Sequence, residues 1–484
     1  MNSWGIKNQI RKKVAEEEGV LRKIAPLNVA LCYPAPYEVA MSSLGFQAIY
    51  QEIHRHPDAS AERAFLPDNP EEYRRNRVPI FTYENERPLS DFSVVAFSIA
   101  YELEITGIFE MLDLCGIPLL RGERAARHPF ILAGGPQTVS NPAILFPFVD
   151  GVILGEGEER IHQFLDIAAG TERKNWPDRL ALLPGCYVPG VSAEIPAPCR
   201  APDGSLPASS RILTKNTVLS SMFLIEPERG CSRLCAYCVM RGRHGGGMRT
   251  VPAGEVLRRI PENARRVGLV GAAVTDHPQI RDLVGGIVES GREIGVSSLR
   301  ADRLADHLGE EFVGLLAKGG YRTLTTASDG ASRRMRDMVG RNTRERHLVR
   351  AAELARLAGM SRLKLYEMIG FPGETMDDIE ELIRFSLEIS RITPLSLSVS
   401  PFVAKRNTPL GGAPFEDISI LESKISRIRA GLKGAVEVKP GSSRFAWIDY
   451  MLSQGNDSAG LAAMYAWRHG GRFAAWKRAF ILNF

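Results

Sequence analysis

Short apolar runs alternate with amphipathic stretches along the first third of the chain. The apolar runs have the length of buried strands, and the stretches between them show helical spacing of apolar residues. Strands that alternate with helices indicate a parallel sheet covered on both faces, so we predict a doubly wound α/β domain over residues 1–170. Ligands of such sheets bind at the carboxyl ends of the strands. The predicted strands cover residues 28–32, 93–98, 130–133 and 149–154, and the predicted helices cover 38–54, 102–115 and 158–167.

The alternation stops over residues 171–217, which contain seven prolines. Because proline lacks a backbone donor and fixes φ, this segment is predicted to be an extended linker. Alternation then resumes over residues 218–435. Six strand–helix units there predict a partial (β/α)6 barrel with its site at the carboxyl ends of the strands, although the pattern alone fits a second open sheet equally well. The six predicted strands cover residues 218–225, 267–274, 296–299, 323–327, 363–369 and 395–399.

The last segment, residues 436–484, contains Trp447, Trp467 and Trp476 at near-helical spacing. Aromatic residues in this pattern are typical of a buried helical face. We therefore predict a helical C-terminal cap on the barrel. Basic residues between the tryptophans keep open a second interpretation, in which the tail stacks on the bases of RNA.

Charge and composition exclude several protein classes. The chain has 61 Lys and Arg against 56 Asp and Glu, a net charge of +5, and 44% hydrophobic residues. These values indicate a globular protein without the dense basic stripe of a dedicated nucleic-acid binder, although nucleic acid is not excluded. The N-terminus lacks a secretory apolar region, and no uncharged run reaches the ~18–20 residues that span a bilayer. We expect a soluble cytoplasmic protein.

Three of the seven cysteines lie within eight residues, directly after a predicted strand. Cys231, Cys235 and Cys238 can place three thiolates on one compact group and leave a fourth coordination position open. A [4Fe-4S] cluster held this way keeps one iron for a small molecule. A structural zinc ion with His244 as its fourth ligand is the alternative. The other four cysteines, Cys32, Cys115, Cys186 and Cys199, are scattered and are predicted to fill space in the core.

At this loop the sequence resembles the radical S-adenosylmethionine superfamily, whose signature is C-x3-C-x2-C with an aromatic residue before the last cysteine, here Tyr237. Three later segments resemble elements of the same family. Residues 327–336 resemble its fourth-strand element, with Asp329 where glutamate is usual. Residues 365–374 resemble its fifth-strand element and residues 400–409 its sixth-strand element.

The resemblance implies an enzyme that holds a [4Fe-4S] cluster on the three cysteines. S-adenosylmethionine would bind the open iron, and its reductive cleavage would yield a 5′-deoxyadenosyl radical. An electron donor such as flavodoxin or ferredoxin is implied as a partner. The substrate, whether a small molecule or a macromolecule, has no recognisable signature in the sequence.

Further contacts to S-adenosylmethionine are implied only where residues match the family. The backbone of Tyr237 would meet the adenine, which Ile369 and Gly370 would border. Gly271, Ala272 and Ala273 occupy the place of a G-G-E element that binds the amino group, but the carboxylate is missing. Partners for the carboxylate and ribose would be Ser298, Arg300, Ser332 and Arg334, for which a structural hydrogen bond is an equally good interpretation.

The N-terminal segments 36–45, 133–136 and 155–158 resemble the cobalamin-binding-like domain that precedes this barrel in a poorly characterised group of the family. The D-x-H-x-x-G string of that domain is absent, so bound cobalamin and a degenerate domain that acts as a lid both stay open. With cobalamin, the implied reaction is a methyl transfer. A methylthiotransferase-like enzyme that modifies RNA or protein, and a non-catalytic iron–sulfur module that binds RNA, are the competing functions.

Overall fold

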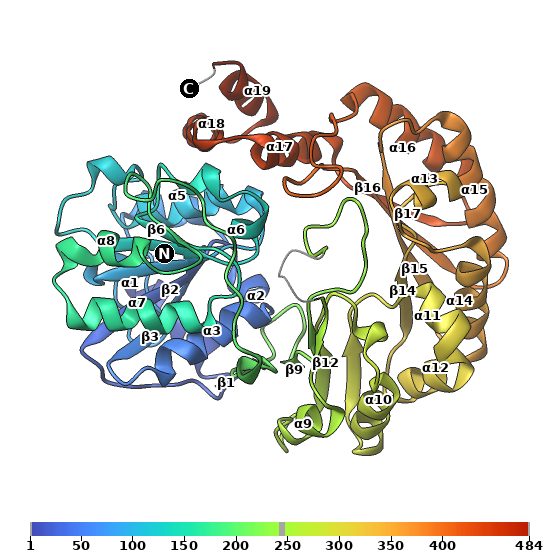
Figure 1. Cartoon of the computed structure of the whole chain (residues 1–484), viewed down its shortest axis with the longest axis horizontal. Coiled ribbons are helices and arrows are strands. Elements are labelled where there is room, and N and C mark those ends of the chain that lie inside the picture. The colour runs from blue at the N-terminus through green and yellow to red at the C-terminus, as the bar shows by residue number, and fades with distance from the viewer. Residues whose placement is uncertain (1, 242–246, 483–484) are drawn as a thin grey trace. The chain divides into compact units, whose positions relative to one another are not determined.

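The computed structural model of the chain describes residues 2–241 and 247–482 and divides it into two compact units. The first unit comprises residues 1–221 and 451–484, and the second comprises residues 222–450. Figure 1 labels the helices and strands of both units. Within the described residues, no helix is long and apolar enough to cross a membrane.

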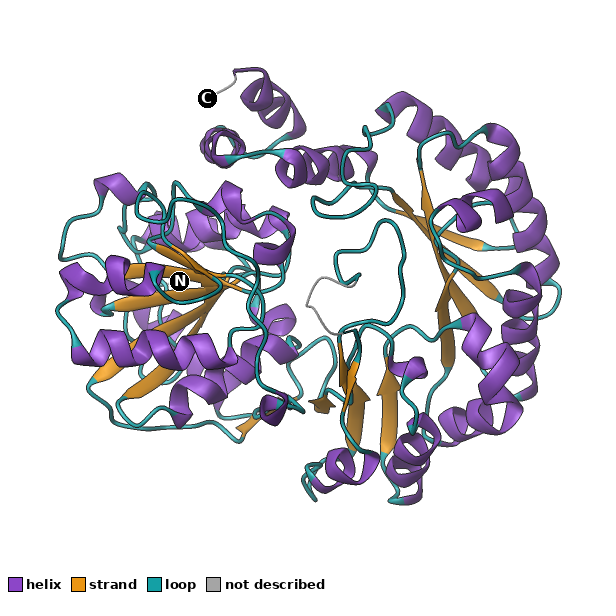
Figure 2. Cartoon of the chain, viewed as in Figure 1, coloured by secondary structure: helices purple, strands orange, loops and turns teal. Residues whose placement is uncertain are grey.

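The first unit is built on a six-stranded sheet with helices on both faces (Figure 2). The sheet is parallel except for its last strand, which pairs antiparallel. The chain order of the parallel strands reverses between β2 and β4, and ligands of doubly wound sheets bind at such a switch point. The predicted α/β fold is therefore confirmed. In spatial order the strands are β3 (Ala59–Phe65), β2 (Leu27–Tyr33), β4 (Val94–Ser98), β5 (Phe130–Gly134), β6 (Gly151–Ile153) and β7 (Cys186–Tyr187).

Strand β3 was not predicted from the sequence, because charged residues stand at its centre. All seven of its residues are buried, including Glu62 and Arg63. Arg63 binds both carboxylate oxygens of Glu17, at 2.8 and 2.7 Å, and its Nε binds Glu84 at 2.6 Å. These ion pairs offset the free-energy cost of burying charged side chains. The hydrophobic pattern alone predicts a loop at such charged residues.

The segment 171–217 is not the extended linker that its prolines predicted. It contains helix α8 (Trp176–Ala181) and supplies strand β7 to the sheet of the first unit. Trp176 and Leu180 are buried in the core beside Phe130 and Phe164. Pro177 lies in the first turn of α8, where its missing N–H costs no helical hydrogen bond, and the other six prolines lie outside the helices and strands.

The second unit contains seven parallel strands in chain order, divided between two adjoining sheets. The hydrogen bond from Leu299 N to Thr325 O, 2.8 Å long, links the ends of the two sheets. Six of the strands overlap the predicted ones, which confirms the α/β fold of this unit, and β17 is an addition. The third prediction, 296–299, shares only Val296 with β13, and the second, 267–274, extends past the end of β12 at Leu269. The strands are β9 (Met222–Ile225), β12 (Arg266–Leu269), β13 (Glu293–Val296), β14 (Thr323–Ala327), β15 (Arg362–Ile369), β16 (Leu395–Pro401) and β17 (Glu437–Pro440).

Helices cover the outer face of these curved sheets, as Figure 1 shows. Helix α15 begins after Thr375, whose hydroxyl and backbone form a capping box with Asp378. This cap matches the helix start expected from a threonine followed by acidic residues. The main covering helices are α10 (Ile280–Glu289), α12 (Gly309–Lys318), α14 (Glu345–Leu357), α15 (Met376–Ser390) and α16 (Ile418–Leu432).

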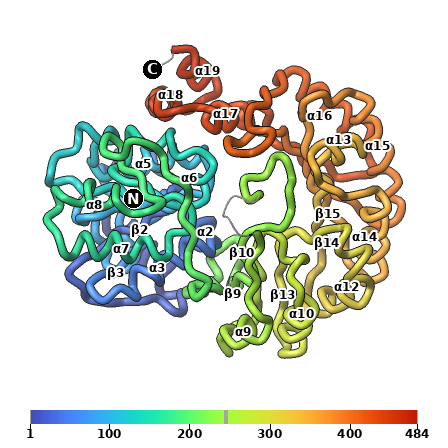
Figure 3. The backbone as a smooth tube through the Cα atoms, viewed as in Figure 1, coloured from blue at the N-terminus to red at the C-terminus, as the bar shows by residue number. Residues whose placement is uncertain are grey.

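The helical C-terminus is confirmed, but most of it does not cap the barrel. Figure 3 traces it through α17 (Ser443–Gln454), α18 (Asp457–Arg468) and α19 (Phe473–Leu482), and residues 451–484 group with the first unit. Asn141 donates hydrogen bonds to Leu452 O at 2.7 Å and Gly455 O at 2.8 Å, and Trp467 Nε1 donates to Glu110 at 2.9 Å. These polar anchors are scattered along the sequence, so the apolar pattern alone did not predict which unit the tail joins.

Candidate functional site

The three clustered cysteines lie on a loop that a two-stranded ribbon closes. Strand β10 (Glu228–Arg229) pairs antiparallel with β11 (Arg249–Thr250), so the loop leaves and re-enters the barrel at one place. Gly230 has φ +89°, and a Cβ there would lie 2.6 Å from Gly247 O. Only glycine fits this close approach of the two backbone segments. His244, the alternative zinc ligand, lies outside the described residues.

All three cysteines of this loop are free thiols. Cys235 is 5% exposed, and Cys231 and Cys238 are half-buried. Burial raises the pKa of Cys231 and of Cys238, and in both cases the neighbouring Cys235 raises it further. The thiols therefore lie close enough to repel one another as anions, and a cationic metal centre would relieve that repulsion.

The donor set on this loop fits an iron–sulfur cluster. Within the described ranges, no group of three or more His, Cys, Asp or Glu side chains is arranged to hold a single metal ion. A four-iron cluster takes thiolate ligands, and three of them leave one iron open. The three free thiols on this one short loop are such a donor set.

Tyr237 ties the cysteine loop to the end of the fourth barrel strand. Its hydroxyl donates to Asp329 Oδ2 at 2.7 Å, and Arg341 Nε lies 3.0 Å from the same oxygen. Burial, and then the Asp329 anion, raise the pKa of Tyr237, which therefore remains a donor. The Tyr237 ring also lies 6.2 Å from that of Phe371, which follows β15. The structure thus brings together the predicted residues Tyr237 and Asp329 beside the fifth strand.

A second set of contacts, which the sequence did not reveal, joins the cysteine loop to the second and third barrel strands. Arg233, between two of the cysteines, binds both carboxylate oxygens of Asp276 at 2.8 and 2.9 Å. Arg303 lies 3.3 Å from Asp276, and Arg300 donates to Asp302 at 2.8 Å. Arg300, the predicted carboxylate partner, is 6% exposed and already holds a protein carboxylate. Ser298, two residues before it, is exposed.

Ser332 and Arg334 converge on one acidic residue at the start of α15. Ser332 Oγ donates to Asp378 Oδ1 at 2.6 Å, and Arg334 forms an ion pair with Asp378. Ser332 also caps helix α13 (Arg333–Met338) by accepting from Met335 N at 3.2 Å. The structure thus gives both side chains a structural contact, and their cofactor roles stay predictions.

Gly370, predicted to border the adenine, lies at the carboxyl end of β15. It has φ +87°, a conformation that favours glycine, and its N–H donates to Glu374 Oε1 at 2.8 Å. Ile369 before it is fully buried. The backbone at this strand end is therefore held by a carboxylate four residues later.

The second-strand segment Gly271-Ala272-Ala273 has no acidic residue of its own, but one reaches it from β10. Ala273 N donates to Glu228 Oε1 at 2.7 Å. Glu228 is fully buried, and burial raises its pKa to about 7. The sequence pattern did not identify Glu228 as a site residue, because residues 228–231 indicate only the start of the cysteine loop.

In the first unit, glycines shape the carboxyl ends of β5 and β6. Gly135 has φ +103°, and a Cβ there would lie 2.5 Å from Ile99 O. Gly155 has φ +93°, and a Cβ there would lie 2.4 Å from Cys199 O. The two glycine-containing motifs found in the sequence thus allow loops to pack closely at the edge where ligands of such sheets bind.

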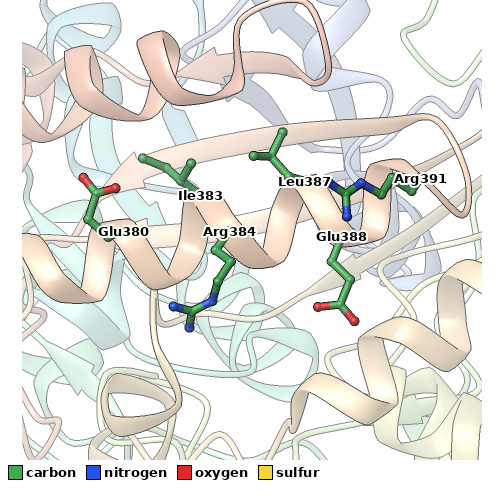
Figure 4. A pocket seen from close by; sticks show the side chains of 6 residues that line it. All are labelled: Glu380, Ile383, Arg384, Leu387, Glu388 and Arg391. Atoms are coloured by element: carbon green, nitrogen blue, oxygen red, sulfur yellow. The ribbon is translucent and has the colours of Figure 1, made fainter.

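A shallow pocket elsewhere in the second unit takes no part in this site. Figure 4 shows its lining, which comes from α15 and its C-cap residue Arg391. Neither the clustered cysteines nor the carboxyl ends of the strands line this pocket. It is therefore a depression on the surface of one helix. Its residues are Glu380, Ile383, Arg384, Leu387, Glu388 and Arg391.

Comparisons with known proteins match both units. A family profile described as "Radical SAM proteins, N-terminal" matches residues 45–189, and one described as "Radical SAM superfamily" matches residues 225–386. An uncharacterized protein of Methanocaldococcus jannaschii is 25% identical over 419 residues, which are 84% of this chain and 83% of that protein. An uncharacterized methyltransferase of Pyrococcus horikoshii is 22% identical over 276 residues, 54% of this chain and 58% of that protein.

Among solved structures, the fold is similar to that of the cobalamin-dependent S-adenosylmethionine radical enzyme OxsB with aqua-cobalamin bound. The TM-score is 0.56 at 14% sequence identity, and the match covers 77% of this chain. It covers 53% of OxsB, so this chain spans about half the length of that enzyme. The likeness establishes the fold.

Proposed function

Because the chain belongs to the radical S-adenosylmethionine superfamily, an enzyme family that uses a [4Fe-4S] cluster and S-adenosylmethionine, we propose that it is a cobalamin-dependent methyltransferase. Cys231, Cys235 and Cys238 would hold the cluster. The observation that carries the proposal is this loop of three free thiols at the mouth of a partial barrel. When bound, the cluster and S-adenosylmethionine supply a 5′-deoxyadenosyl radical, and cobalamin supplies a transferable methyl group.

The residues around the loop position it and exclude water. The bond from Tyr237 to Asp329 and the paired bonds from Arg233 to Asp276 fix the loop against strands on both of its sides. Burial of Cys235 keeps solvent from one thiolate. Such outer contacts orient metal ligands and tune reduction potentials. We propose a flavodoxin or ferredoxin as the electron source.

Three observations support cobalamin at the first unit. The sheet is doubly wound with a switch point between β2 and β4, its glycine loops line the carboxyl edge, and the fold matches that of an enzyme solved with aqua-cobalamin. A relative described as a methyltransferase supports methyl transfer. The acceptor would be an unactivated carbon centre.

The experiment that tests methyl transfer compares reconstituted protein with and without added cobalamin. The protein is incubated anaerobically with reductant and S-adenosylmethionine that carries a labelled methyl group. We expect the protein to retain cobalamin through gel filtration, to form S-adenosylhomocysteine only when cobalamin is present, and to place the label on the corrinoid. Protein that retains no cobalamin and forms no S-adenosylhomocysteine would contradict the methyltransferase proposal while leaving radical chemistry open.

A further inference from the structure

Strands β15 and β16 of the second unit alternate apolar and polar residues. Parallel strands that are buried on both faces normally read as continuous apolar runs instead. The sequence of β16 begins Leu395-Ser-Leu-Ser-Val-Ser400, and β15 alternates leucines with Arg362, Lys364 and Tyr366. The leucines of both strands are buried, and the helices α14 and α15 contact the strands on the outer side that Figure 1 shows. The polar residues therefore line the opposite face of the sheet.

The parallel register places these polar side chains in rows across neighbouring strands. Adjacent strands stand about 5 Å apart, so the residues of one row can contact one ligand together. One row contains Lys364, Ser396 and Glu437, the next contains Tyr366, Ser398 and Lys439, and Ser400 lies beyond them toward the strand ends. We call these residues, together with Arg362, the inner face.

The inner face carries more positive than negative charge. Glu437 lies 2.8 Å from Arg362 and 3.1 Å from Lys439, so one carboxylate serves two cations. Lys364 is half-buried and forms no ion pair within the part of the chain that the structure describes. Its Nζ lies 4.6 Å from the centre of the Tyr366 ring. A cation–π contact leaves the ammonium charge in place, so Lys364 can still bind an anion.

Tyr366 adds an aromatic surface beside this charge. Its side chain is 38% exposed, and Ser398 and Ser400 supply hydroxyl groups on the neighbouring strand. Ligand sites typically combine such an apolar surface with a few placed polar groups. Lys364 lies five residues before the end of β15, about 16 Å along the strand. The inner face thus suits a part of the substrate that lies away from the reacting carbon at the strand ends.

We propose that Lys364 and Tyr366 bind the anionic end of the substrate, an organic molecule in which a phosphate or carboxylate group adjoins an apolar or aromatic skeleton. This inference rests on the proposed function, because it names the substrate class of the same barrel. An ammonium group binds either anion through charge-assisted hydrogen bonds, and serine hydroxyls add further donors. Contacts remote from the reacting carbon hold it in position for reaction.

The test measures the binding of two small aromatic anions, phenyl phosphate and benzoate, to the anaerobic, cluster-loaded protein by saturation-transfer NMR titration. We expect the wild type to bind at least one of them, and Lys364→Met to lower that affinity by about tenfold or more. Lys364→Arg, which keeps the charge, should retain most of the affinity. The anion that binds more tightly identifies phosphate or carboxylate as the group on the substrate. Binding of the neutral benzyl alcohol should not depend on residue 364.

Lys318→Met is the matched control. Lys318 is exposed in the last turn of α12, on the outer side of the same unit, and forms no ion pair with the described residues. Its substitution removes the same charge from the chain but leaves the inner face intact, so the affinity for both anions should not change. Equal losses in Lys318→Met and Lys364→Met would mean that net charge alone explains the binding, and would overturn the inference.

Ionic strength gives a second measurement. The affinity of the wild type for the anions should fall as the salt concentration rises, and Lys364→Met should flatten this fall. Unchanged affinity in Lys364→Met, or a wild type that binds neither anion, would overturn the inference. These measurements need neither S-adenosylmethionine nor cobalamin. A wild type that binds the anions through Lys364 but forms no S-adenosylhomocysteine would therefore contradict the proposed methyl transfer alone.

Discussion

Replacing Cys235 with alanine is expected to remove the iron–sulfur cluster and to abolish cleavage of S-adenosylmethionine. Cys235 is the most buried of the three clustered thiols, and the described residues place no other cysteine in the barrel to replace it. Two thiolates cannot hold a four-iron cluster that already leaves one iron open. Iron and the visible absorption of the reconstituted protein should fall to background, and formation of 5′-deoxyadenosine should fall at least about a hundredfold.

Cys115→Ala is the control for this variant. Cys115 is buried at the end of helix α5 (Ile105–Leu114) in the first unit, and burial raises its pKa to about 11, so it stays a protonated core residue. Its substitution should leave iron content and cleavage intact. A Cys235→Ala variant with full iron and full turnover would show that the cluster is held elsewhere.

Replacing Lys424 with methionine is expected to lower the free energy of unfolding by about 3–5 kcal/mol. Lys424 is 2% exposed and donates to Glu374 Oε1 at 2.8 Å and to both oxygens of Glu416 at 2.7 and 2.8 Å. Without the ammonium, the fully buried Glu374 carboxylate has no countercharge. Because Glu374 also accepts from Gly370 N, this loss reaches the strand end that borders the site. Urea unfolding monitored by circular dichroism measures the effect.

Two further variants test whether the buried charge explains this loss of stability. Arg427→Met removes a half-exposed ion pair with Glu380 from the same helix and should cost at most about 1 kcal/mol. Glu374→Gln added to Lys424→Met should restore part of the lost stability, because no buried charge then remains on residue 374. Equal losses in Lys424→Met and Arg427→Met would contradict the buried-charge explanation.

The pH dependence of Lys424→Met follows from the same carboxylate. Burial raises the pKa of Glu374 even with Lys424 in place. A carboxyl group whose pKa is higher in the folded state than in the unfolded state stabilises the fold at low pH, and that contribution is lost as the pH rises through the folded-state pKa. The variant should therefore lose less stability near pH 5 than near pH 8.

Local patterns in the sequence predicted the strands and the cysteine loop. The six predicted barrel strands are apolar on at least one face, and the spacing of Cys231, Cys235 and Cys238 is a purely local signal. Strand β3 escaped prediction because Arg63 and Glu62 occupy buried positions that only distant partners make tolerable.

The contacts that complete the site are non-local. Arg233 meets Asp276, and Glu228 meets Ala273, about 45 residues apart along the chain in each pair. No periodicity relates such residues, because their proximity follows from the parallel register of β9 and β12. The placement of the C-terminal tail similarly depends on Asn141, more than 300 residues before its partners.

The most direct test of the central claim is the anaerobic formation of 5′-deoxyadenosine. Protein reconstituted with iron and sulfide is reduced, supplied with S-adenosylmethionine and analysed by liquid chromatography and mass spectrometry. The account predicts 5′-deoxyadenosine that requires reductant and is absent in Cys235→Ala. A fully loaded wild-type protein that releases none, whether or not cobalamin is added, would contradict the assignment of radical S-adenosylmethionine chemistry to this loop.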